Sequence, residues 1–356
     1  MKILHHVDDD GFCSAAIVNW LIKPYGVVLN DDDCILYNYN GSISIPEFHK
    51  DEYVYIVDIS LDNEVFKFIK EAVRAKCRVI HIDHHKTTLE WLKNAKATQK
   101  RVLDKVTKFY NTRVSASMLC WVYASASKYL NQNNNINFCI DQDTFYINDE
   151  PETVDDVKKI KVPVPHKIPP VVMYVDDYDT SSPYTHKFGD ETQYFHYGFE
   201  LETDKSPNSP IWQEMLFDYT GVFHVDDYVA NGKIIGMYKD ASNTIIGKSN
   251  AFESTVFGIP CICINTCGNS SAVGNELFNQ YPITIVYHFA KGKWKYSIYN
   301  NPDVKRVDVS VIAKFCGGGG HAAASGFVSK LNYFDPTSKS NKIKEFHERD
   351  YLTLPR

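Results

Sequence analysis

Three short apolar runs of this chain each end in aspartates or histidines. Residues 2–6 lead into Asp8-Asp9-Asp10-Gly11, residues 53–57 into Asp58, and residues 78–82 into Asp83-His84-His85. Parallel strands of an open α/β sheet deliver their C-terminal ends to one crevice, so we expect the three acidic clusters to meet there. Carboxylates packed this closely repel one another unless protons or metal ions offset their charge. Hard divalent cations with oxygen and imidazole ligands are the expected counter-charge.

The segments between these runs follow helical patterns. Residues 14–22 are apolar and helix-like, and residues 62–76 alternate apolar and charged side chains as an amphipathic helix does. Asp62 is placed to cap that second helix. Residues 115–129 carry the apolar face of a third helix. Strands and helices thus alternate, which predicts an α/β fold whose mostly parallel sheet is covered on both faces.

A fourth apolar run, residues 171–175, predicts a buried strand that ends at Asp176-Asp177. Four prolines between residues 163 and 170 exclude a continuous helix before it. An acidic turn taken alone is more often a helix cap than a metal site. Four such clusters at the ends of predicted strands together favour a metal site.

The chain of 356 residues is long enough for two domains. Polar residues and prolines in 203–210 predict a surface connection, and residues 226–239 have a helical pattern. The second part has strand patterns at 244–249, 259–264, 283–288 and 294–299, and a helical pattern at 307–315. We therefore predict a first domain at 1–205, a connection at 206–240, a smaller second domain at 241–332 and a C-terminal tail at 333–356.

The composition limits the classes of partner. A net charge of −6 and a pI near 6.1 argue against a protein that grips long nucleic acid, but leave small phosphorylated ligands and short single strands open. No apolar run approaches the roughly 20 residues of a membrane helix. The N-terminus turns polar within a few residues, and nine cysteines form no evident disulfide framework. We therefore expect a cytoplasmic protein with reduced thiols and no membrane partner.

Four consecutive glycines precede a histidine near the C-terminal end of the predicted second domain. They are Gly317, Gly318, Gly319 and Gly320, followed by His321. Consecutive glycines let a phosphate approach the backbone N–H groups closely, and the imidazole adds a donor. An isolated glycine run is more often a flexible turn. Both interpretations are open from these residues alone.

The order of these motifs resembles the DHH phosphoesterase superfamily, which includes RecJ-type exonucleases, nanoRNases, cyclic-dinucleotide phosphodiesterases and family II pyrophosphatases. The resemblance reaches to about residue 330. The segments that carry it are His6-Val7-Asp8-Asp9-Asp10-Gly11, Ile56-Val57-Asp58, Asp83-His84-His85, Val175-Asp176-Asp177-Tyr178-Asp179 and the glycine run with His321, which resembles the DHHA1 substrate domain.

This resemblance implies an α/β metal-binding DHH domain and a smaller α/β DHHA1 domain across a cleft. It also implies two Mn²⁺ ions, with Mg²⁺ as an alternative. One ion would be held by His6, Asp8 and Asp58, and the other by Asp10, Asp58, His84 and Asp177. Asp176 and Asp179 are alternatives to Asp177 as the fourth-motif ligand. His85 would face the substrate phosphate, and His85 and Asp58 are the expected catalytic residues.

The implied reaction is hydrolysis of a phosphodiester by a water that two metals activate, without a serine or cysteine nucleophile. The expected substrates are short oligonucleotides, linear or cyclic dinucleotides, or a nucleotide bisphosphate. Two alternatives stay open: a catalytically silent module that sequesters a nucleotide signal, and a single-strand-specific exonuclease. The chain could act as a monomer or as a homodimer.

One departure from the family pattern concerns the second domain. NanoRNase-type DHHA1 domains often carry an Arg-Ser pair at the end of the strand before the helix, where this chain has Tyr299 and Asn300. A tyrosine can stack on a base, but it makes no bidentate contact with a phosphate. Tyr299 is therefore expected to bind substrate together with the glycine run and His321, and Lys305 or Arg306 could supply the missing charge.

Overall fold

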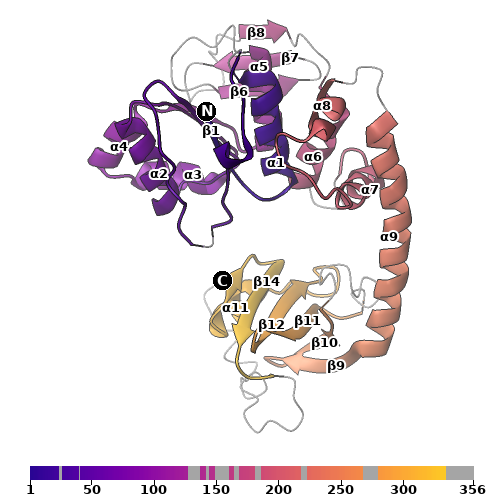
Figure 1. Ribbon diagram of the computed structural model, residues 1–356. Coiled ribbons are helices and arrows are strands. Elements are labelled where there is room, and N and C mark those ends of the chain that lie inside the picture. Colours follow the sequence, from indigo (N-terminus) through magenta and orange to yellow (C-terminus); the bar gives the residue numbers. More distant parts are fainter. Residues whose placement is uncertain are drawn as a thin grey trace. The chain divides into compact units, whose positions relative to one another are not determined.

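The computed structural model divides the chain into two compact units, Met1–Ile235 and Gly236–Arg356 (Figure 1). The structure describes residues 1–23, 26–39, 41–126, 137–141, 144–148, 160–163, 168–180, 186–217, 223–267 and 280–333. The predicted tail therefore lies outside the described residues from position 334 on. Among the described helices, none combines the length and apolar character needed to cross a bilayer.

Unit 1 is built on a five-stranded parallel sheet with the strand order β2-β1-β3-β4-β5. The strands are β1 (Lys2–His5), β2 (Cys34–Leu36), β3 (Tyr53–Val57), β4 (Arg78–Asp83) and β5 (Thr107–Tyr110). The three predicted strands lie side by side, so their C-terminal ends reach the same edge. This confirms the predicted parallel α/β architecture, to which the structure adds β2 and β5.

Helices cover both faces of this sheet (Figure 1). Ile3 and Tyr55 face a core formed with α1 (Asp9–Ile17), α5 (Ala116–Ala126), α6 (Pro170–Thr180), α7 (Asp190–Phe199) and α8 (Pro210–Phe217). Leu4 and Ile56 face the other core, formed with α2 (Asn63–Arg74), α3 (Lys86–Asn94) and α4 (Ala97–Leu103). Neighbouring residues of a strand thus bury opposite sides, as the pleat requires.

The predicted helix boundaries are confirmed where the pattern was amphipathic. Asp62 caps α2, and its side chain accepts a hydrogen bond from the N–H of Val65 at 2.7 Å. The expected helix at 14–22 begins earlier, with Asp8 as its cap, and ends in a π-helical turn at Val18–Ile22. Asp10 therefore lies on a helix rather than in an extended segment.

The strand predicted at 171–175 is wrong, because these residues belong to helix α6. Pro170 occupies the first helical position, where the missing N–H of proline costs no hydrogen bond. Val171, Val172 and Val175 are all buried, at the spacing of one helical face. A five-residue apolar run does not distinguish a buried strand from a helix by its pattern alone.

A three-stranded antiparallel sheet completes the described part of unit 1. Its strands are β6 (Asn137–Asp141), β7 (Thr144–Asn148) and β8 (Ile160–Pro163). The long helix α9 (Phe223–Asn250) then runs from unit 1 into unit 2. The helix expected at 226–239 is thus longer, and the strand predicted at 244–249 is wrong because α9 includes those residues.

Unit 2 contains a mixed six-stranded sheet with the order β13-β14-β12-β11-β10-β9. Its strands are β9 (Ala251–Val256), β10 (Ile259–Asn265), β11 (Ile283–Ala290), β12 (Lys293–Asn300), β13 (Gly319–Gly320) and β14 (Ala324–Ser329). Only β10 and β11 pair in parallel among these described strands. Helix α11 (Val309–Phe315) packs on one face through Val309 and Ile312.

Candidate metal centre

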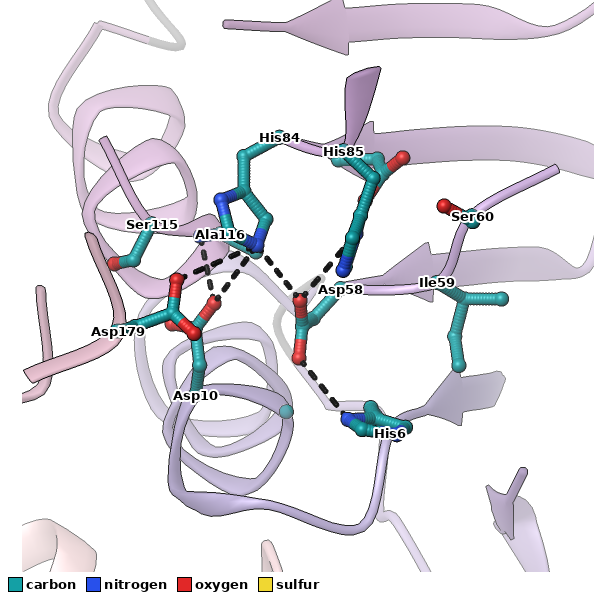
Figure 2. Close-up of polar contacts among 12 residues, drawn as sticks. His6, Asp10, Asp58, Ile59, Ser60, His84, His85, Ser115, Ala116 and Asp179 are labelled. Atoms are coloured by element: carbon teal, nitrogen blue, oxygen red, sulfur yellow. Dashed lines mark hydrogen bonds and ion pairs between the residues drawn. The ribbon is translucent and has the colours of Figure 1, made fainter. Parts of the chain in front are cut away.

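Six charged or titratable side chains converge beyond the C-terminal ends of β1, β3 and β4 (Figure 2). They are His6, Asp10, Asp58, His84, His85 and Asp179. His84 Nε2 lies 3.3 Å from Asp58 Oδ1, 3.4 Å from Asp179 Oδ2 and 3.9 Å from Asp10 Oδ2. On the other side of Asp58, its Oδ2 lies 3.8 Å from His6 Nδ1. Asp58 therefore stands in the middle of the cluster.

Three groups formed by these residues and Asp8 have the composition of metal sites, and in each group one ligand atom per residue lies within 4.8 Å of the others. The groups are His6–Asp8–Asp58, Asp10–His84–Asp179 and Asp58–His84–His85. Carboxylate and imidazole ligands without thiolate suit hard or borderline divalent cations. The structure thus brings together every predicted metal ligand except Asp177, whose place is taken by its predicted alternative Asp179.

The carboxyl group of Asp177 points to a different part of the fold. It accepts hydrogen bonds from the N–H groups of Lys187 and Phe188, at 2.9 and 3.3 Å, and from the hydroxyl of Thr192 at 2.6 Å. Asp177 therefore holds the start of α7. Asp179, two residues later on α6, reaches the cluster instead.

Backbone amides at the start of α5 hold two of the carboxylates in place. Both oxygens of Asp10 accept hydrogen bonds of 2.8 Å, from the N–H groups of Ala116 and Ser117. Asp176 accepts another from the N–H of Ser115 at 2.7 Å. The partial positive charge of a helix N-terminus favours carboxylates at this position. No local sequence pattern predicts these contacts, because the two residues of each hydrogen bond are about 60 to 110 positions apart.

Asp58 has an unusual backbone conformation, with φ at +55°. Its N–H donates to the carbonyl of Ile82 at 3.1 Å, and the following carbonyl, of Ile59, accepts a hydrogen bond from His81 Nε2 at 2.8 Å. Tyr110 donates to His81 Nδ1 at 2.8 Å, which leaves His81 neutral with its proton on Nε2. Burial also lowers the pKa of His81. A strained conformation held by buried hydrogen bonds is typical of a functional site.

The first group, His6–Asp8–Asp58, is built around the start of α1. Asp8 caps that helix by accepting a hydrogen bond from the N–H of Gly11 at 3.0 Å, and its other oxygen lies 2.6 Å from His6 Nδ1. Burial alone would raise the pKa of Asp8, but the hydrogen bonds from His6 and Gly11 lower it to about 2. A side chain at Gly11 would collide with the backbone of His6, which explains the glycine in this turn.

The carboxylate of Asp83 orients the ring of His85. Its Nδ1 lies 2.7 Å from Asp83 Oδ1, and the hydroxyl of Thr88 donates to the other oxygen of Asp83. Burial lowers the pKa of His85, but the hydrogen bond and charge of Asp83 raise it more, with help from Asp179 and Asp10. Asp83 therefore favours the protonated form of His85, in which Nε2 is a donor.

The cluster carries more negative charge than its protein partners neutralise. Burial, followed by the charges of Asp10 and Asp8, raises the pKa of Asp58 well above its ordinary value. Oδ2 of Asp58 and Nε2 of His84 are buried, and neither has a hydrogen-bond partner in the described part of the chain. A buried acceptor and a buried ring nitrogen that lack partners are costly unless a cation or proton lies between them. The residues present therefore fit divalent cations.

The predicted substrate-binding residues of unit 2 lie around the end of α11. The N–H groups of Gly317 and Gly318 donate to the carbonyls of Lys314 and Ala313, so both amides end the helix rather than being open to a phosphate. Gly319 and Gly320 form β13, and His321 is exposed. Tyr299 pairs in register with Ala324, whose carbonyl accepts from the N–H of His321 at 2.8 Å.

No family model matches the sequence, and no curated protein matches it. Solved structures do match over nearly the whole chain. One is described as the DHH domain of a member of the s1p family of ribosomal proteins, with 14% identity and a TM-score of 0.54, covering 100% of this chain and 87% of that chain. The chain has the DHH fold. The fold predicted from the motifs is therefore confirmed.

Two further DHH-fold neighbours are less similar. RecJ in complex with Mn²⁺ from Thermus thermophilus matches with 12% identity and a TM-score of 0.47, covering 99% of this chain and 52% of that chain. A pGpG-specific phosphodiesterase, PggH from Vibrio cholerae, matches with 12% identity and a TM-score of 0.39, covering 92% of each chain. At these identities the likeness concerns the fold alone.

Proposed function

We propose that this DHH-fold protein is a divalent-metal-dependent phosphodiesterase that hydrolyses short oligonucleotides or linear or cyclic dinucleotides. The observation that supports this most is that two buried atoms inside a cage of carboxylates, Asp58 Oδ2 and His84 Nε2, have no hydrogen-bond partner in the described part of the chain. Carboxylates packed this closely repel one another unless cations or protons offset their charge.

The ligand groups divide into two sets that share Asp58. His6, Asp8 and Asp58 would hold one cation, and Asp10, Asp58, His84 and Asp179 the other. When bound, divalent cations such as Mn²⁺ or Mg²⁺ would lower the pKa of a water and offset the charge of a phosphate. Asp179 replaces Asp177 in this proposal, since Asp177 is engaged by α7.

His85 is the residue that we propose to contact the substrate phosphate. Asp83 fixes its ring and raises its pKa, which favours the protonated form whose Nε2 donates a hydrogen bond to a phosphoryl oxygen as its negative charge grows in the transition state. We propose that a water, rather than a serine or cysteine side chain, attacks phosphorus. Cys13 on α1 is fully buried, and burial raises the pKa of its thiol, so it forms no thiolate near neutral pH.

The decisive experiment measures hydrolysis with and without metal. Protein stripped with a chelator and then supplied with Mn²⁺ is assayed on bis-p-nitrophenyl phosphate and on dinucleotides, cyclic dinucleotides and oligomers of two to roughly ten units. We expect Mn²⁺-dependent turnover that His84→Ala abolishes. No turnover of any substrate, combined with tight binding of a dinucleotide, would instead support a protein that sequesters a nucleotide.

A further inference from the structure

A pocket of ≈ 290 Å³ opens directly beside the metal centre within unit 1. Asp8, Asp10 and Asp179 form part of its lining, and these are three of the proposed metal ligands. The lining also includes aromatic and apolar residues of α6 and α7, among them Tyr178 and His196. A part of the substrate that fills this pocket would therefore lie close to the phosphate that the metals would bind.

The aromatic wall consists of two stacked pairs between α6 and α7. Tyr178 stacks on His196 with ring centroids 3.9 Å apart, and Tyr174 stacks on Phe195 at 5.2 Å. Tyr174 and Tyr178 lie four residues apart on α6, so one helical face presents both rings. Tyr178 also stacks at a longer distance on His186, with ring centroids 6.1 Å apart, and the residue is 37% exposed and lines the pocket.

Hydrogen bonds to Asp9 connect this aromatic wall to the metal centre. His196 Nδ1 lies 2.8 Å from Asp9 Oδ2, and Lys205 Nζ lies 2.7 Å from Asp9 Oδ1. Asp9 stands in sequence between the proposed ligands Asp8 and Asp10. The same three-residue turn thus positions the cations on one side and the aromatic wall on the other, which lowers the ordering cost of binding a ligand to both.

We propose that this pocket binds the nucleobase attached to the scissile phosphate, mainly by stacking. Its volume is at the lower end of the roughly 300–1,000 Å³ typical of ligand pockets, so it suits one base with its ribose rather than a longer strand. Aromatic stacking tolerates every base, because each base has a π-face. The inference rests on the proposed phosphodiesterase function and narrows its substrates.

The charges of the pocket select among those substrates. Four aspartates line it, and His196 is the one basic residue in the described lining. The described lining contains no lysine or arginine that could bind a second phosphate away from the metals. The pocket therefore favours a dinucleotide with one phosphodiester between its two nucleosides over a nucleotide bisphosphate.

The test compares substrates that differ only in the base. With Mn²⁺ present, KM and kcat are measured for a dinucleotide and for its analogues that have an abasic ribose on either side of the phosphate. Tyr178→Ala should raise KM for the dinucleotide roughly 5- to 150-fold and leave the analogue lacking the pocket base nearly unchanged. Tyr178→Phe keeps the ring and should stay within about twofold of wild type. Tyr238→Ala, an exposed tyrosine on α9 outside the pocket, is the matched control.

A binding measurement separates this inference from the proposed reaction. Calorimetry with adenosine 5′-monophosphate and with ribose 5-phosphate should show tighter binding of the nucleotide, and Tyr178→Ala should remove that difference. If no substrate is hydrolysed but the difference persists, the reaction is wrong and the pocket stands. If Tyr178→Ala affects the dinucleotide and both abasic analogues equally, or Tyr178→Phe loses as much as Tyr178→Ala, the base pocket is wrong although the hydrolysis stands.

Discussion

The charge balance of the metal centre predicts that the metal-free protein loses stability as the pH rises. Burial, together with the charges of Asp10 and Asp8, raises the pKa of Asp179 from 3.8 to about 8. The folded protein therefore holds a proton that the unfolded chain has already released. Because the folded pKa is the higher one, the stabilisation is complete below about pH 4 and is lost as the pH rises through about 8. Asp58, whose pKa is also raised, acts in the same direction.

The size of the effect follows from the number of protons. One proton more in the folded state changes the free energy of unfolding by about 1.4 kcal/mol per pH unit. Because the folded group is half ionised near pH 8, the change between pH 6 and pH 8 is about 2.3 kcal/mol. The Asp179 side chain is 27% exposed, and screening by solvent reduces this to about 1–2 kcal/mol. A unit the size of Met1–Ile235 shifts its Tm by roughly 2–4 °C per kcal/mol, which gives a decrease of about 2–8 °C.

The assay is thermal unfolding of chelator-treated protein, followed by circular dichroism, at several pH values with and without saturating Mn²⁺. Metal binding requires ionised carboxylates, so the rise in Tm on adding Mn²⁺ should grow with pH. Asp179→Asn should flatten the pH dependence of the metal-free protein and weaken the Mn²⁺ effect.

Asp177→Asn is the matched control on the same helix. It disturbs the hydrogen bonds to Lys187 and Phe188, so it should lower Tm at every pH while keeping the response to Mn²⁺. The reasoning is refuted if Asp179→Asn retains the wild-type pH slope, or if the Mn²⁺ shift is the same at pH 6 and pH 8.

Three other substitutions test the remaining parts of the arrangement. Asp58→Asn should lower Mn²⁺-dependent turnover by more than about 100-fold while circular dichroism shows a retained fold, and wild-type activity would contradict its central role. His81→Ala leaves the buried Ile59 carbonyl and Tyr110 hydroxyl without their partner, so chemical denaturation should show a loss of about 2–4 kcal/mol. His321→Ala should raise KM for a dinucleotide much more than for bis-p-nitrophenyl phosphate, and equal effects would remove it from substrate binding.

The parallel sheet and the meeting of the first three acidic clusters could be predicted from the sequence. The β-branched strands and the helix capped by Asp62 carry strong local patterns, and parallel pairing then places Asp58 and Asp83 at one edge. The contacts that hold the carboxylates could not be predicted in this way. The N–H groups of Ala116 and Ser117 bind Asp10 across more than 100 residues, and no local pattern encodes such a contact.

The exchange of Asp177 for Asp179 shows how secondary structure decides which residue reaches a metal. On a strand, residues 177 and 179 point to the same side, and either could have joined the cluster. On helix α6 successive residues turn by about 100°, so Asp176, Asp177 and Asp179 face α5, α7 and the metal centre respectively. An acidic motif therefore identifies the neighbourhood of a ligand, whereas the backbone geometry selects the carboxylate. The same rotation brings Tyr178 to the pocket next to Asp179, which links the proposed base site to the proposed ligand through a single turn of helix.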